Sequence, residues 1–135
     1  MAVTKAKQAK RVMLNTDFAG IRAGAMLYVA TPEIVAHYIS GIPAGEVRDI
    51  IRLRRDLARQ NKADATCPVS TAIFLRQIAE KSLADMQAGA TPSAVVPFWR
   101  VIEPGSKIAK RLSCDDDWIG HQRRLEAADG EAAGD

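Results

Sequence analysis

Apolar residues recur in short clusters that predict helices joined by brief turns. Thr31-Pro32-Glu33 is typical of a helix start, because threonine caps the first turn, proline fits its first position and glutamate suits the helix dipole. The next apolar positions share one helical face: Ile34, Val35, Tyr38 and Ile39. The Gly/Pro-rich segment 41–45 ends this helix, and the apolar run 26–30 before it is typical of a strand.

Two further helices are predicted downstream. One covers about 48–60, with Ile50, Leu53 and Leu57 inward and Ile51 beside them, and a loop follows at 61–65. The other starts near Pro68 or Ser70 and runs to about residue 86. Its helical spacing turns one set of residues to the core: Ala72, Leu75, Ala79, Leu83 and Met86. The open face is then left to Ser70, Thr71, Phe74, Arg76, Gln77, Glu80 and Lys81.

The last third predicts a small β-wing followed by a final helix. Residues 95–96 and 101–102 are strand-like and are followed by a turn at 104–105. The spacing from Ser113 to Asp116 is typical of a capping box, and it opens a helix that holds Trp118, Ile119, Leu125 and Ala128. The order of helix, turn, helix, loop, helix and wing favours a mainly α, winged helix-turn-helix domain over residues 25–130. Residues 1–24 are expected as a basic, mobile arm, and residues 131–135 as a disordered acidic tail.

The octet 95–102, Val-Val-Pro-Phe-Trp-Arg-Val-Ile, carries the strongest candidate chemistry. Phe98 and Trp99 stand side by side, followed by Arg100, and aromatic rings and guanidinium groups both stack on planar ligands such as bases. A plainer interpretation also fits, in which the octet is a strand that enters the core with the two rings on opposite faces.

The octet also resembles the active-site motif of the O6-alkylguanine-DNA alkyltransferase family, Pro-Cys-His-Arg-Val, and more closely its alkyltransferase-like members, in which an aromatic replaces the cysteine. Four residues match the frame, with Phe98 at the cysteine position and Trp99 at the histidine position: Pro97, Arg100, Val101 and Ile102. Segments 42–47 and 103–108 are similar to turns of that family, and 118–130 is similar to its C-terminal helix. The resemblance covers residues 28–130, about 100 residues in all.

This resemblance implies a DNA-binding protein that extrudes a nucleotide into a pocket beside the motif. The lesion pocket would be formed by Pro97, Phe98, Trp99 and Arg100. The DNA-binding helix would be the third helix, inserted near Ser70 and Thr71 and supported by Phe74, Arg76 and Gln77. Arg76 would fill the space left by the flipped base. Ile50 stands where the family has a tyrosine, and the family's supporting glutamate would fall near Glu126 or Asp129.

Charge is unevenly distributed, although the net charge is only +3. Residues 1–62 hold 11 Lys/Arg against 5 Asp/Glu, whereas residues 113–135 hold 2 against 7. A basic first half favours phosphate contacts, for which the candidates are Arg48, Arg52, Arg54 and Arg55. The alternative is that these arginines, with Arg59, form the solvated side of one helix.

Enzymatic and metal chemistry find little support in the residues. Alkyl transfer needs an activated thiolate, which Phe98 and Trp99 do not offer, and the remaining thiol candidate, Cys67, has no nearby histidine in sequence. His37 and His121 lie apart, and the acids 115–117 are explained by a helix dipole, so neither metal nor cofactor is expected. No membrane span or signal segment is predicted, and two cysteines fit a cytoplasmic protein.

Three function classes follow. The first is a non-enzymatic protein that recognises alkylated double-stranded DNA by base flipping and marks it for a repair-protein partner. The second is a plain winged-helix DNA-binding or regulatory protein, in which Phe98 and Trp99 are core residues. The third is a small lesion-processing enzyme that uses an acid from the C-terminal half. Preference for alkylated over plain duplexes separates the first class from the second.

Overall fold

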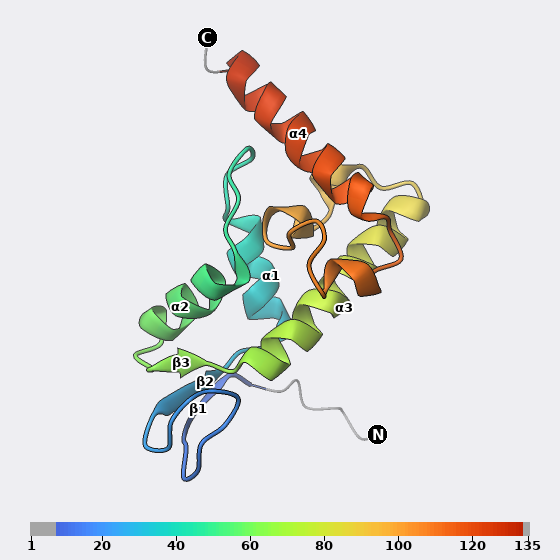
Figure 1. The fold of residues 1–135 in the computed structure, drawn as a ribbon. Helices are drawn as coiled ribbons and strands as arrows, with labels where there is room; N and C mark the ends of the chain where they lie inside the picture. Colours follow the sequence, from blue (N-terminus) through green and yellow to red (C-terminus); the bar gives the residue numbers. More distant parts are fainter. Residues whose placement is uncertain (1–7, 134–135) are drawn as a thin grey trace, which may run out of the picture.

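The computed structural model describes residues 8–133 of the 135-residue chain. In this range, four helices and a three-stranded sheet form a mainly helical architecture. The elements are α1 (Pro32–Ser40), α2 (Ile50–Gln60), α3 (Pro68–Gln87), α4 (Asp116–Ala133), β1 (Lys10–Met13), β2 (Met26–Val29) and β3 (Ala65–Thr66). Figure 1 shows the sheet at one end of the molecule, α1 between α2 and α3, and α4 leading away at the opposite end. The prediction of a helical domain with a short β component is confirmed at this level.

The N-terminal segment differs from the arm expected over 1–24. Strand β1 pairs antiparallel with β2, with Lys10 opposite Val29, and β3 adds to β2 in parallel. The loop between β1 and β2 makes a second, tighter turn, in which Phe18 and Ile21 form a bridge and Ala19 and Gly20 both have positive φ. The mobile-arm prediction is therefore wrong for this part of the segment, and residues 1–7 lie outside the described range.

The predicted wing is also wrong. Residues 95–96 and 101–102 form no strands; the chain turns instead through two short 3-10 helices, η1 (Pro92–Ala94) and η2 (Phe98–Arg100). Pro97 directly follows the first segment, lacks the N–H that a strand ladder needs and fixes φ, which favours a turn over a continuing strand. The turn at η2 directs both rings into one core, whereas a strand would place them on opposite faces.

The helix ends show which local signals decide the structure. Thr31 caps α1 as predicted, and its hydroxyl oxygen accepts a hydrogen bond from the Ile34 N–H at 3.2 Å. Helix α2 begins at Ile50, capped by the Asp49 side chain, two residues later than expected. Ser113 has a different role from the predicted cap, because its hydroxyl and its N–H both donate to Glu80 of α3, at 2.6 and 2.8 Å. At its other end, α4 continues to Ala133, inside the range expected as a tail.

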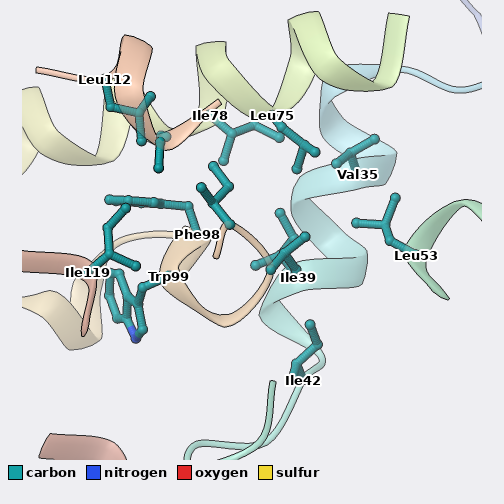
Figure 2. Packing of buried hydrophobic residues seen from close by; sticks show 14 of the residues in the cluster. Val35, Ile39, Ile42, Leu53, Leu75, Ile78, Phe98, Trp99, Leu112 and Ile119 are labelled. Atoms are coloured by element: carbon teal, nitrogen blue, oxygen red, sulfur yellow. The ribbon is translucent and has the colours of Figure 1, made fainter. Parts of the chain in front are cut away.

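The core lies where α1, α3, η2 and the start of α4 meet (Figure 2). Leu75 and Ala79 are buried as the helical spacing predicts, and Ile78 joins them on the same side of α3. Figure 2 shows Phe98 among these aliphatic side chains and Trp99 beside Ile119. Ile51, expected near the core, is instead 67% exposed.

Candidate nucleic-acid interface

The two rings of the octet form part of a closed aromatic cluster. Phe98 stacks on Trp118 with centroids 5.7 Å apart, and Trp99 meets both rings edge to face. Phe98 is 0% and Trp99 1% exposed, so neither ring presents a surface to a ligand. The prediction that these two rings line an open lesion pocket is wrong in this structure. The plainer interpretation, that both rings are buried core residues, is confirmed.

Arg100 is likewise occupied within the protein. Its Nε and Nη2 donate to both carboxylate oxygens of Glu126 in α4 at 2.7–3.2 Å, and its Nη1 donates to the Ile42 carbonyl at 2.6 Å. Burial is the largest single influence and would raise the pKa of Glu126, but the hydrogen bonds and charge of Arg100, with smaller contributions from Trp99 and the Gly45 N–H, together hold the pKa below its usual range. The guanidinium expected to stack on a base therefore joins α4 to the turn after α1.

Arg123 of α4 adds a second connection that sequence reasoning missed. Its Nε donates to the Trp99 carbonyl at 2.7 Å and its Nη2 to the Ile102 carbonyl at 3.1 Å. Burial lowers the pKa of Arg123 from its ordinary value. These bonds satisfy carbonyl groups of the η2 turn that no strand partner reaches, so the octet is held in place by α4.

Two of the predicted lesion-pocket residues, Pro97 and Arg100, border a hollow. It has a volume of about 190 Å³ and lies between the end of α1 and the η1 turn, where Ser40 and Ser93 also contribute. The two rings take no part in it. The four residues of the octet prediction are thus neighbours in space, but they do not line one site.

The predicted DNA-binding residues of α3 divide between surface and core. Thr71 is 1% exposed, and its hydroxyl donates to the Cys67 carbonyl, so its assignment to the open face is wrong. Phe74 packs partly against the core and Ser70 is half-buried, whereas Arg76 and Gln77 are exposed. Sequence reasoning missed two exposed apolar residues on this helix, Val69 and Ile73.

Of the four predicted phosphate contacts, Arg48 precedes α2 and the other three lie on two sides of that helix. Arg48 places its guanidinium 5.6 Å from the Tyr38 ring centroid, and Arg52 pairs with Asp56 at 3.6 Å. Both arginines are therefore already engaged on the side that faces α1. Arg54 and Arg55 lie on the other side, where Arg59 joins them.

These three residues, called here the arginine cluster (Arg54, Arg55 and Arg59), border a hollow of about 270 Å³ between α2, β3 and the loop that carries Ile21. Among residues 8–128, whose side chains the structure describes, none of the three has a carboxylate within salt-bridge distance. The sequence signal for Arg59 was its spacing of four from Arg55, which places both side chains on one helical face.

Tyr38 and Asp56 connect α1 to α2. The Tyr38 hydroxyl donates to Asp56 Oδ2 at 2.5 Å. This hydrogen bond, with the charge of Arg52, holds the pKa of Asp56 below its ordinary value of 3.8, while burial and the same bond raise the pKa of Tyr38. The pair favours the ionised carboxylate beside a neutral phenol.

Replacing Tyr38 by Phe is expected to lower the free energy of unfolding near neutral pH by about 1–1.5 kcal/mol, because a hydrogen bond to a charged group is lost. Asp56 has a depressed pKa in the folded state, so this stabilisation is complete above pH 3.8 and fades as the pH falls through the lower folded value. Urea denaturation at about pH 7 and about pH 3 measures it. An equal loss at both pH values would contradict the assignment.

The two cysteines of the chain, Cys67 and Cys114, are both free thiols. Cys67 is buried at the start of α3, where its sulfur accepts a 3.5 Å hydrogen bond from the Ser70 N–H. Burial raises the pKa of Cys114. Over residues 8–133, no three His, Cys, Asp or Glu side chains gather as a metal ion would require. Within the same range, no helix combines the length and apolar character needed to cross a membrane.

No family model, curated protein or solved structure matches this chain. The resemblance to the alkyltransferase family therefore stays a prediction from the motif residues.

Proposed function

We propose that the protein binds the phosphate backbone of double-stranded DNA and performs no chemistry on it. The observation that supports this is the arginine cluster, three guanidinium groups on one side of α2 without carboxylate partners among the described residues. Arginine pairs well with phosphate because its planar fork donates two parallel hydrogen bonds. Exposed Arg76 and Gln77 on α3 offer further polar contacts.

Of the two DNA-binding classes, the closed aromatic cluster favours binding without lesion preference. Recognition of a flipped base by Phe98 or Trp99 would require these buried rings to leave the core, where they contact Trp118. Stacking on one base contributes about 1–3 kcal/mol, which is no more than the loss from removing a large aromatic from a core. The same residues supply neither thiolate nor proton acceptor, which supports a non-enzymatic role.

Replacing Arg55 or Arg59 by Gln is expected to weaken binding to every duplex alike. Each lost phosphate contact should make the dependence of log K on log salt shallower by about 0.9. Fluorescence anisotropy with a labelled duplex, between about 50 and 200 mM salt, measures this slope. Arg111→Gln, at an exposed arginine outside the cluster, is the matched control and should leave the slope unchanged.

Competition between an O6-methylguanine duplex and a plain duplex tests the rest of the proposal. Equal competition is expected. A clear preference for the modified duplex that Trp99→Phe abolishes would restore the lesion-recognition class. Absence of salt-dependent binding to either duplex would reject DNA binding altogether.

A further inference from the structure

The hollow beside the arginine cluster is bordered by parts of the chain that are distant in sequence. Arg54, Arg55 and Arg59 come from α2, Thr66 from β3, and Ile21 from the loop between β1 and β2. Figure 1 shows α2, β3 and this loop together at the sheet end of the molecule. The loop between β1 and β2 thus adds Ile21 to the border of a hollow that lies beside α2.

Arg54, one of the residues that border the hollow, has a donor without a partner among the described residues. The Nε of Arg54 is buried and has no hydrogen-bond partner in the part of the chain that the structure describes. Asp64 also borders the hollow, but its carboxylate accepts the Met26 N–H at 2.8 Å and lies outside salt-bridge range of the three arginines. A buried donor without a partner is costly, which indicates a missing acceptor.

The frame around Arg54 is fixed by backbone contacts. The Thr66 hydroxyl donates to the Arg54 carbonyl at 2.7 Å, and the Asp64 N–H donates to the Met26 carbonyl at 2.9 Å. Ile21 and Ile51 add apolar surface beside the arginines. The hollow is therefore a preorganised cationic site with apolar sides.

We propose that this hollow binds a single phosphate group, with Arg54, Arg55 and Arg59 as its donors. At about 270 Å³, the hollow lies just below the usual range of small-molecule pockets, which begins near 300 Å³, so a compact anion fits better than a whole nucleotide. The inference refines the proposed function, on which it rests, because it assigns one backbone phosphate to a defined place. A free phosphate has the same chemistry and should bind there too.

The first test is a titration of the full-length, ¹⁵N-arginine-labelled protein with inorganic phosphate at low salt, followed by NMR. The Nε–H resonances of Arg54, Arg55 and Arg59 should shift together, while those of Arg111 should not. Arg54→Gln should weaken phosphate binding by about tenfold, since a hydrogen bond to a charged group is lost. Ile21→Glu keeps α2 intact but adds a negative charge at the wall, and it should weaken phosphate binding by a similar factor.

A second measurement separates this inference from DNA binding. Inorganic phosphate should compete with duplex DNA, and Arg54→Gln should weaken both ligands. If phosphate shifts the Nε–H resonances of the three arginines but no duplex binds, the phosphate site is supported and its ligand is free phosphate, not the DNA backbone. If a duplex binds while phosphate leaves the three resonances unmoved, or if both variants bind phosphate as wild type does, the hollow is rejected although the protein still binds DNA.

Discussion

Trp99→Ala is expected to lower the free energy of unfolding by about 3–5 kcal/mol, the range measured when large aromatics are removed from cores. The ring is almost fully buried and contacts both Phe98 and Trp118. Its removal therefore creates a cavity and also removes two edge-to-face aromatic contacts. For a chain of this length, the loss corresponds to a fall in Tm of about 10–20 °C. Thermal unfolding followed by circular dichroism measures it.

Ile73→Ala is the matched control, because it removes a large apolar side chain that is half exposed on α3. Its effect should stay within about 0.5 kcal/mol. A Trp99→Ala protein with unchanged Tm but weakened binding to a lesion duplex would show that the ring serves a ligand, and it would overturn the core assignment.

Glu126→Ala is expected to lower the free energy of unfolding by about 3 kcal/mol, because it leaves the guanidinium of Arg100 without its carboxylate partner. The two side chains are only 15% and 16% exposed, so water compensates little. The carboxylate also lies 3.5 Å from the Gly45 N–H, at a turn where φ is 89° and an added Cβ would approach the Glu126 carbonyl to 3.4 Å. The loss of Glu126 would therefore loosen the contact between α4 and this turn.

The pH dependence follows from the direction of the shift. Glu126 has a folded pKa below its ordinary value of 4.5, so its contribution is complete above that pH and is lost as the pH falls through the folded value. Urea denaturation across this range should show wild type approaching Glu126→Ala in acid. Lys81→Ala, which breaks an exposed pair with Asp85, should cost at most about 0.5 kcal/mol. If Glu126→Ala lowered the free energy of unfolding by as little as Lys81→Ala, the ion pair between Arg100 and Glu126 would not behave as a buried one.

Helices were predictable because their signals are local. The Thr31-Pro32-Glu33 start and the periodic apolar face of α3 depend on residues within a few turns, and the structure confirms both elements. The sheet was not predictable in the same way. All four residues of β1 are exposed, so the strand has no alternation of apolar and polar positions, and its existence depends on pairing with β2 across a 12-residue loop.

The candidate site was less predictable than the fold, because the residues that contact its side chains are distant from them in sequence. Burial of Phe98 and Trp99 depends on Trp118, and Arg100 is neutralised by Glu126, 26 residues away. A short motif contains none of these partners, so it could not show whether its rings face a ligand or the core. The division of the α2 arginines likewise depends on Tyr38 and Asp56, which engage one side of the helix and leave the other free.

The order of strands has a consequence for self-association. With β2 in the centre, β1 and β3 provide the outer edges of the sheet. The β3 edge is only two residues long and adjoins α2, whereas the β1 edge begins with the cations Lys10 and Arg11. Like charges at a short edge repel a second copy that would dock there and extend the ladder. The charged edge of β1 is therefore expected to disfavour extension of the sheet by a second copy.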